Sequence, residues 1–305
     1  MLGGIHLKLN INDFEIVGNK YKADEEKQDI KTMSKFKEIP YKSILVLSII
    51  VICCIFADFI MTKDPTYMDL VNTSLKPGSE FYFGTDTMGR DIFSMIWYGG
   101  RISLFIGILS TIISTSIAIL YGTISACSNQ FIDDLMMRIT EMILSIPSIL
   151  IIIFIQGIIR NTNIISLAIV IGITSWMNIA KIIRAEVRQI KNSEYIIASK
   201  TMGASFFFIL KEHMVLNFLP AIMFMVVTNI GAAIGTEATL SFLGIGLPIE
   251  IISWGSMLSL AEGALLSNLW WIILIPGIFL VLTLVSITNI GNYLREKSNK
   301  KISNL

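Results

Sequence analysis

Residues 193–205 read SEYIIASKTMGAS, inside a polar and basic stretch that interrupts an otherwise apolar chain. Asn192 or Ser193 can cap a helix, and Glu194 suits the positive end of the helix dipole. Small side chains, which let another protein approach closely, follow at Ala198, Ser199, Gly203, Ala204 and Ser205. The stretch therefore predicts a short helix outside the bilayer that a soluble partner contacts. The alternative is an ordinary amphipathic loop helix.

The composition around this stretch is that of an integral membrane protein. Of the 305 residues, 53% are hydrophobic and 15% are charged, whereas soluble domains carry about 25% charged residues. Cys53, Cys54 and Cys127 lie in or near apolar runs, and we expect them to pack as small hydrophobic side chains. Residues 1–40 are polar, which predicts a solvated cytosolic extension rather than a signal peptide.

Six apolar segments are candidates for membrane-spanning helices, which need about 20 residues to cross a bilayer core. They are residues 43–61, a span within 102–132, and residues 142–159, 161–180, 214–236 and 269–293. We expect Pro147 to kink or loosen the first turns of the third span. The chain is thus predicted to be an all-α membrane protein with four parts. These are a polar extension over 1–40, a first helix and outer loop over 41–98, a core of five helices over 99–295, and a cytosolic tail over 296–305.

Lys and Arg predict the orientation, because they gather on the cytoplasmic side of membrane proteins. With both termini inside, 19 of the 24 Lys and Arg residues lie on the inner side, and the long outer segment 237–268 has none. We therefore expect a multi-pass protein of the cytoplasmic membrane with both termini in the cytosol. The stretch 193–205 then also lies in the cytosol.

The loop after the first span contains FGTDTMGRDIFS at residues 83–94. Its motif comprises Gly84, Thr85, Asp86, Gly89, Arg90 and Asp91. The glycines permit tight turns, and the three charged residues are expected to close a structural knot of ion pairs at the membrane surface. A metal site or a catalytic carboxylate pair is disfavoured, because the chain's histidines, His6 and His213, both lie on the inner side.

Two further segments suggest structural roles. Asp134 and Arg138 are four residues apart on one helix face, which predicts an ion pair at the inner interface, with Glu141 following. On the outer side, LSFLGIG at 240–246 and WGSML at 254–258 predict a folded-in loop that lines or caps a vestibule, with Trp254 as an interfacial ring.

The spans contain few polar side chains. Gln156, Asn178 and Asn229 are the candidates for lining a pathway, although polar groups in spans usually bond neighbouring helices. His213 is expected to cap a helix end or lie at the interface rather than relay protons. The patterns of nucleotide-binding loops, zinc proteases and serine hydrolases do not occur. No enzymatic activity, cofactor, metal or nucleic acid is therefore expected.

These motifs resemble those of ABC importer permeases. The stretch 193–205 is similar to their cytoplasmic coupling motif, Glu-Ala-Ala-x3-Gly, with Ser199 where the second Ala is usual. Residues 83–94 resemble the Leu-Gly-Thr-Asp-x-x-Gly-Arg-Asp signature of the C-type permeases of peptide and nickel importers. The resemblance covers roughly residues 35–295. It departs at Glu141, where Asp is usual, at Leu216, where Pro is usual, and at Pro248, the remainder of a proline-rich stretch.

The resemblance implies the type I ABC importer permease fold, with six transmembrane helices and a cytoplasmic coupling helix. It implies a non-catalytic subunit for di- or oligopeptide uptake, with nickel or a metallophore as the alternative substrate. The partners would be a second homologous permease, two ATP-binding cassette subunits and an extracytoplasmic substrate-binding protein. The coupling residues would be Glu194, Tyr195, Ala198, Ser199, Gly203, Ala204 and Ser205.

A stand-alone secondary transporter or channel is the alternative of a different class. Such a protein needs ionisable groups inside its spans to couple transport to ions. The predicted spans offer only Asp58, near the end of the first. This scarcity favours a permease that is driven by partner ATPases.

Overall fold

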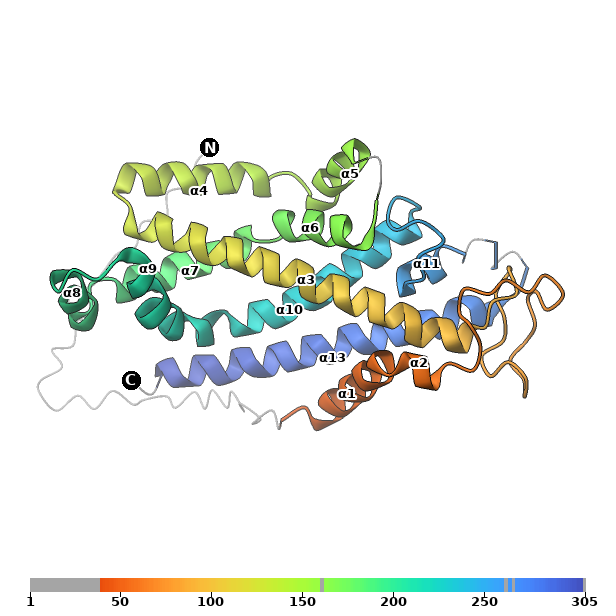
Figure 1. Cartoon of the computed structure of the whole chain (residues 1–305). Helices are drawn as coiled ribbons and strands as arrows, with labels where there is room; N and C mark the ends of the chain where they lie inside the picture. Colours follow the sequence, from red (N-terminus) through yellow and green to blue (C-terminus); the bar gives the residue numbers. More distant parts are fainter. Residues whose placement is uncertain (1–38, 160–161, 261–262, 265–266, 304–305) are drawn as a thin grey trace, which may run out of the picture. The chain divides into compact units, whose positions relative to one another are not determined.

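The computed structural model describes residues 39–159, 162–260, 263–264 and 267–303, with side chains up to Lys297. The helices are α1 Tyr41–Ile55, α2 Ala57–Ile60, α3 Ile92–Cys127, α4 Gln130–Leu144, α5 Ser148–Ile158, α6 Ile164–Thr174, α7 Met177–Ile190, α8 Glu194–Thr201, α9 Phe206–Ile209, the π-helix η2 Leu210–Met214, α10 Val215–Phe242, α11 Trp254–Leu258 and α13 Trp270–Ser303 (Figure 1). Strand-like pairing in the described part is limited to one bridge, between Thr85 and Asp91. The predicted all-α class is confirmed. The predicted extension over 1–40 lies outside the described residues except for its last two.

Three continuous helices are long and apolar enough to cross a membrane: α3, the run from α9 through η2 to α10, and α13. Two helix pairs meet the same criterion together but are bent, α4 with α5 by 83° and α6 with α7 by 46°. The described residues therefore hold three to five candidate spans. In place of the predicted first span stands α1, whose 15 residues are fewer than the usual length.

The predicted third span is not one helix. α4 continues to Leu144, and the 11-residue α5 begins only after Pro147. The break follows from proline, which has no amide hydrogen and disfavours helical backbone at the residue before it. Pro147 thus precedes α5 as its N-cap residue instead of kinking it, and Asp134 and Arg138 lie on α4, a helix as predicted. The predicted fourth span is likewise interrupted, between α6 and α7.

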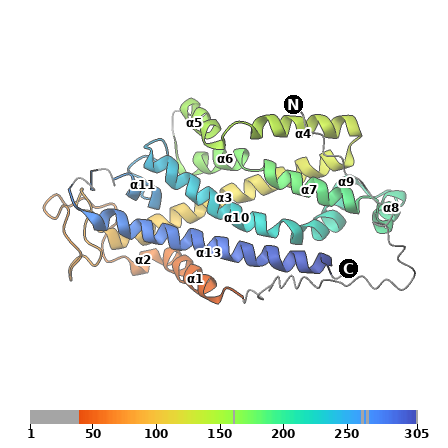
Figure 2. The same ribbon diagram turned by 180° about the vertical axis from the view of Figure 1, so that it is seen from behind.

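α3 packs against α6, α7 and α10, and α13 runs beside both α10 and α1 (Figures 1 and 2). Glycine allows these close approaches. A Cβ at Gly122 of α3 would lie 2.6 Å from the backbone oxygen of Ala180 on α7, and one at Gly107 would lie 2.6 Å from Cγ1 of Ile234 on α10. Small residues at helix contacts are how membrane helices gain packing energy where lipid offers no hydrophobic drive.

A side chain of α3 also holds the end of α1. Arg101 donates from Nε to the carbonyl oxygen of Cys54 at 3.1 Å and from Nη2 to that of Ile55 at 3.3 Å. The same guanidinium forms an ion pair with Asp58 of α2 at 3.0 Å. Carbonyls in the last turn of a helix have no partner within it, so this arginine supplies donors that α1 cannot supply for itself.

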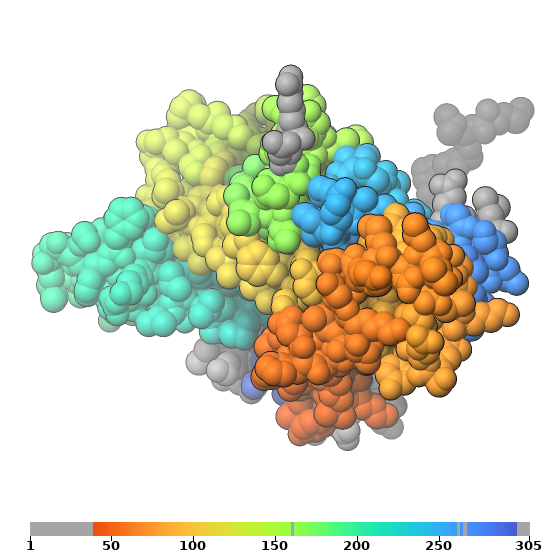
Figure 3. Space-filling view, turned by 45° about the vertical axis from the view of Figure 1, so that its right-hand side comes forward, coloured from red at the N-terminus to blue at the C-terminus, as the bar shows by residue number. Residues whose placement is uncertain are grey.

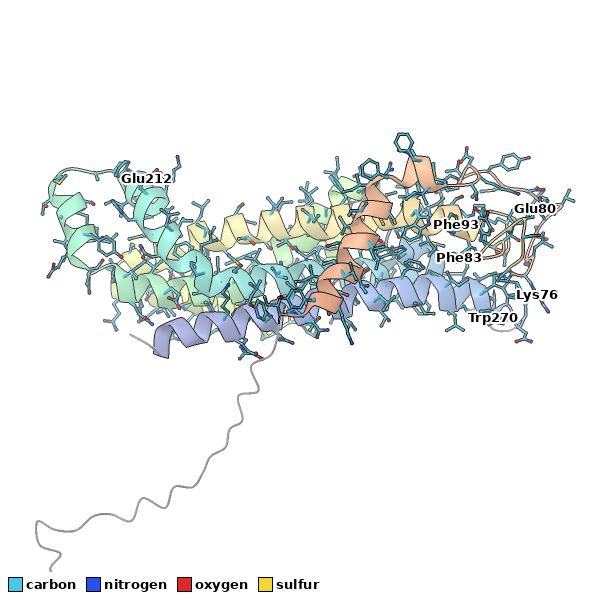
Figure 4. The ribbon with its side chains drawn as sticks, turned by 90° about the horizontal axis from the view of Figure 1, so that it is seen from below. Lys76, Glu80, Phe83, Phe93, Glu212 and Trp270 are labelled. Carbon is cyan, nitrogen blue, oxygen red and sulfur yellow. The ribbon has the colours of Figure 1, made fainter. Side chains whose placement is uncertain are left out.

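Residues 39–303 have two ends of different character. α8 and α9 project from one end, and the outer loop, residues 61–91, lies with α11 at the other (Figures 1 and 3). Figure 4 shows Glu212 near the first end and Lys76, Glu80 and Trp270 at the second. Each end has its own apolar core, which includes Trp254 and Trp271 beside the outer loop and Ile183, Ile196 and Phe218 beside α8.

Candidate functional site

α8 is a short helix with a defined end. Its last turn closes with two hydrogen bonds, from the amide of Gly203 to the carbonyl of Lys200 at 3.0 Å and from the amide of Ala204 to that of Ser199 at 3.1 Å. This is the Schellman arrangement, which requires a left-handed residue after the helix. Gly203 supplies it with φ of +84°. Among the described residues, no atom lies within 4 Å of a Cβ built at Gly203, so this part of the chain leaves room there for a partner.

The start of α8 differs from the prediction in one detail. Ser193 is the N-cap residue, but its side chain does not cap the helix. Its hydroxyl instead donates to the carbonyl of Ile190 at 2.6 Å, which fixes the turn between α7 and α8.

α8 is anchored to the rest of the chain at two points. Ile196 is fully buried in the apolar core beside α8. Ser199 lies 3.1 Å from Nε2 of His213 in η2, and its hydroxyl donates to the carbonyl of Tyr195 at 2.8 Å. The contact of Ser199 with His213 is a side-chain hydrogen bond between α8 and η2. Through this bond α8 is joined to the helix that continues into α10.

The outward face of this end is apolar and exposed. Met202 has 82% of its surface exposed, Phe207 69% and Tyr195 43%. The tip that carries α9 stands out from the rest of the molecule in Figure 3. Of the predicted coupling residues, Glu194, Tyr195, Ala198, Gly203 and Ser205 are exposed, and Ser199 and Ala204 are half-buried. Clustered apolar side chains on a surface mark a contact with another molecule.

A buried carboxylate connects α4 with α7 beside α8. Asp133 accepts from Nε of Arg184 at 2.6 Å and from Nη2 of the same residue at 2.7 Å. It also accepts from Arg188 and from the hydroxyl of Ser125. Asp133 is 1% exposed, so its charge is balanced almost entirely by these side chains.

The predicted ion pair between Asp134 and Arg138 does not form. One residue along a helix turns the side chain by about 100°, so Asp133 faces α7 while Asp134 is exposed. Glu141 pairs instead with Lys181 of α7 at 3.5 Å. Asp134, Arg138 and Glu141 line a charged hollow of about 580 Å³ together with Met137, Lys181 and Arg184.

The outer loop contains a smaller charge arrangement than predicted. Arg90 and Asp86 form a buried ion pair of 2.7 Å. Asp91 does not join it, because its Oδ2 caps α3 by accepting from the amide and hydroxyl of Ser94 and from the hydroxyl of Thr62. Gly84 and Gly89 both take positive φ, of 76° and 74°, as the predicted tight turns require.

Further contacts close the outer loop. Thr85 donates from its hydroxyl to the carbonyl of Asn72, and its own carbonyl accepts from the indole of Trp271 on α13 at 3.1 Å. Hydrogen bonds from the side chain of Asn72 and from backbone amides lower the pKa of Asp69. Phe83 and Phe93 meet edge to face with ring centroids 5.2 Å apart (Figure 4). The loop is therefore an ordered part of the fold.

Two of the three predicted pathway residues share a cavity. Asn178 and Asn229 line a space of about 310 Å³ that is bordered by both helix breaks, with Pro147 and Ser148 on one side and Thr174 and Ser175 on the other. Asn229 also donates to the hydroxyl of Ser114 at 2.8 Å. Gln156 lies elsewhere, with its Oε1 accepting from Thr162 at 3.1 Å.

The outer segment, residues 243–258, and the last turns of α10 before it contain two departures from the sequence analysis. Trp254 is fully buried rather than interfacial, with its indole donating to the carbonyl of Ile96 at 3.0 Å. Glu237, one turn before the end of α10, is also fully buried and accepts from the hydroxyls of three serines. The expectation that Asp58 is the only ionisable group in the spans is therefore wrong. The predicted span ends at 236, whereas α10 continues to Phe242 and includes Glu237.

Comparisons with known proteins bear on most of the chain. Residues 118–301 match the family described as binding-protein-dependent transport system inner membrane component. The dipeptide transport system permease protein of Bacillus subtilis (strain 168) is 32% identical over 275 residues, which cover 90% of this chain and 86% of that protein. The oligopeptide transport system permease protein of the same strain is 33% identical over 289 residues, which cover 92% and 94%.

A solved structure shares the fold. The MetNI methionine ABC transporter in an inward-facing conformation aligns with a TM-score of 0.51 and 16% identity, covering 67% of this chain and 96% of that one. The likeness confirms the predicted fold of an ABC importer permease.

Proposed function

Because the chain belongs to the family of binding-protein-dependent transport system inner membrane components, we infer that it is the membrane-spanning permease of an ABC importer that takes up peptides. The two relatives described above are named for dipeptide and oligopeptide transport, which favours a peptide over nickel or a metallophore. Energy for import then comes from ATPase subunits that bind the permease, and the chain itself is non-catalytic.

The observation that carries the mechanism is the construction of α8. Its exposed face offers an apolar surface to which an ATPase can bind, and the open space at Gly203 lets the ATPase approach that surface closely. Ile196 and the bond between Ser199 and His213 tie α8 to η2 and α10. When the ATPase moves, α8 therefore moves with it and displaces α10, which crosses the membrane. Rigid helices of this kind switch between two packed arrangements.

The orientation follows from the same arrangement. We place α8 and both termini in the cytosol and the outer loop with α11 on the outer side of the cytoplasmic membrane. The excess of Lys and Arg on the α8 side supports this placement. The complete importer would hold this chain, a homologous second permease, two ATPases and an extracytoplasmic peptide-binding protein that approaches the outer loop.

The cavity at Asn178 and Asn229 is our candidate for part of the peptide pathway. Helix ends leave backbone carbonyl and amide groups without partners, and two helix breaks border this cavity. Transporters use such discontinuous helices to offer backbone groups to a substrate. A peptide, whose own backbone needs donors and acceptors, matches that lining.

Two glycines provide a matched test of the coupling role. Gly203 and Gly244 both have positive φ, of 84° and 74°, and neither has an atom within 4 Å of a built Cβ. Substitution by Val therefore strains both turns alike, but only Gly203→Val places a side chain where the ATPase is proposed to bind. Glu194→Lys reverses the charge at the start of the same helix.

The measurement is peptide-stimulated ATP hydrolysis by the reconstituted complex of two permeases and two ATPases, with the peptide-binding protein present, together with peptide uptake into the same vesicles. We expect Gly203→Val and Glu194→Lys to insert normally but to weaken ATPase binding or uncouple hydrolysis from uptake, while Gly244→Val keeps its ATPases. Unchanged stimulation and uptake in both α8 variants would show that α8 is not the coupling element.

A further inference from the structure

Glu237 has an unusual environment for a charged side chain. It lies on α10 within a candidate span and is 0% exposed. Its hydrogen-bond partners in the described part of the chain are three serine hydroxyls, with no Lys, Arg or His among them. Ionisable groups inside membrane spans are costly and are retained for function. The mechanism proposed above gives Glu237 no task.

The three serines come from three different elements. Ser103 of α3 donates to Oε2 of Glu237 at 3.1 Å. Ser241, one turn further along α10, donates to Oε1 at 2.9 Å, and Ser253, the N-cap residue of α11, donates to the same oxygen at 2.7 Å. The carboxylate thus lies where α3, α10 and α11 meet.

Each serine also binds a backbone amide of the outer segment. The hydroxyl oxygen of Ser103 accepts from the amide of Trp254 at 3.2 Å. That of Ser241 accepts from the amide of Leu247 at 3.3 Å, and that of Ser253 from the amide of Ser256 at 3.0 Å. A hydroxyl has one proton to give, and in all three serines that proton goes to Glu237. An acceptor at 237 therefore sets the direction of three hydrogen-bond chains that end on the outer segment.

The backbone of α11 packs closely against α10 around the carboxylate of Glu237. A Cβ at Gly255 would lie 2.6 Å from the Cα of Ala238 and 2.9 Å from Oε1 of Glu237. Trp254 fills the space against Gly100, where a Cβ would lie 2.6 Å from the indole ring. With this backbone so close, α11 cannot shift its position without breaking the hydrogen bonds to Glu237.

We propose that Glu237 is the positioning residue of the outer segment: it holds α11 against α3 and α10 and so sets the closure of the outer end. This rests on the proposed function for its role in import. The hydrogen-bond arrangement predicts a graded series of variants. Gln keeps the shape and one oxygen but turns one acceptor into a donor that faces a hydroxyl proton, and Ala removes all three bonds.

The test measures how firmly α11 is held. Met257 of α11 is 3% exposed and Ile249 of the outer segment is 45% exposed. In full-length protein with Cys53, Cys54 and Cys127 replaced by Ala, Met257→Cys reports on release of α11 and Ile249→Cys controls for reagent access and insertion. A membrane-impermeant maleimide is added from the outer side of vesicles that contain the assembled complex. Thr239→Val is the matched control for position 237, because its hydroxyl bonds within α10, to the carbonyl of Gly235 at 2.8 Å.

We expect labelling at Met257→Cys to be about tenfold faster in Glu237→Ala, intermediate in Glu237→Gln, and unchanged in Thr239→Val. Peptide uptake should fall in the same order. Equal labelling rates in the Glu, Gln and Ala proteins would overturn the proposal. If Glu237→Ala does not reach the membrane, Ser103→Ala, which removes one of the three links, decides together with Glu237→Gln. Labelling that shows the series in a complex without peptide uptake would count against the proposed function and not against the role of Glu237.

Discussion

Asp133 and Glu237 are both almost fully buried, yet the chain satisfies them in opposite ways. Asp133 is paired with two arginines of α7 that lie one helical turn apart, and the partners of Glu237 among the described residues are hydroxyls. The arginine pair neutralises a charge, so it holds two helices together strongly but in one geometry. Each serine donates its proton to the carboxylate of Glu237 and accepts a hydrogen bond from a neutral backbone amide. Loss of a partner of Asp133 should therefore weaken the contact between α4 and α7, and loss of a partner of Glu237 should change the position of the outer segment.

At the residue scale, Asp133→Asn should destabilise the protein, and Asp134→Asn should not. Asn at 133 keeps the shape but turns one acceptor into a donor that faces the guanidinium of an arginine, whereas the exposed Asp134 interacts with Arg184 electrostatically and without a hydrogen bond. We expect a loss of about 1–3 kcal/mol at 133 and a change within about 0.5 kcal/mol at 134. Thermal unfolding of the purified protein in detergent measures both. Equal midpoints for the two variants would contradict the assigned ion pair.

Neither acid could be assigned from the sequence. The (i, i+4) spacing made Asp134 and Arg138 the natural pair, but that rule considers one helix at a time, and the true partners lie on another helix. The spacing of Arg184 and Arg188 was the available signal for a carboxylate facing them. Glu237 was placed in an outer loop because the predicted span ended at 236. The turn glycines Gly84, Gly89 and Gly203 were predictable, because positive φ depends on local chain geometry.

At the element scale, the breaks between helices are harder to predict from the sequence than the helices themselves. Apolar length predicted the existence of α3, α10 and α13, since a long apolar run has few alternatives in a bilayer. It did not predict their ends, because α3 begins at Ile92, α10 continues to Phe242 and α13 continues to Ser303. The same criterion joined part of α4 to α5 and α6 to α7, and it did not predict the bends of 83° and 46°. Pro147 explains the first bend. The second, at Ser175 and Trp176 between α6 and α7, contains no proline, and apolar length does not predict it.

Close helix contact offers a second prediction, based on two glycines. Gly122 faces α7, where a Cβ would lie 2.6 Å from a backbone oxygen, and Gly157 of α5 has nothing within 4 Å. Gly122→Ala should cost about 1–3 kcal/mol because rigid backbone must move apart. Gly157→Ala should be neutral or should stabilise by up to about 1 kcal/mol, because it removes backbone freedom from the unfolded chain. Opposite shifts of the unfolding midpoint are the expected result. A similar loss in both variants would mean that α3 and α7 do not touch at Gly122.

At the scale of the whole molecule, long helices join two ends that are built for different surroundings. The α8 end presents short helices joined to η2 by the contact of Ser199 with His213, whereas the outer end, which also exposes Leu70 and Val71, is held by hydrogen bonds in the loop and at Glu237. Charge distribution predicted the sidedness of these ends, because Lys and Arg act over whole loops. It could not predict the hydrogen bonds at Glu237, since these bring Ser103 of α3 together with Ser241 and Ser253, which lie far along the chain from it.

Sidedness is the third prediction. In protein lacking the native cysteines, Glu250→Cys should react with an impermeant maleimide in intact cells, and Gln189→Cys should react only after permeabilisation. Both positions are exposed in the structure, so a difference in labelling reports the side of the membrane and not burial. The reverse pattern would invert the topology and remove α8 from the reach of an ATPase.

The contact between Arg101 and α1 has a consequence for biogenesis. α1 is the first of the described helices to leave the ribosome, it is short for a bilayer, and the carbonyls of its last turn are bonded by a residue made 46 positions later. Until α3 follows it through the translocon, those carbonyls must be solvated by water or lipid headgroups. We therefore expect α1 to be retained near the insertion site and released into lipid together with α3.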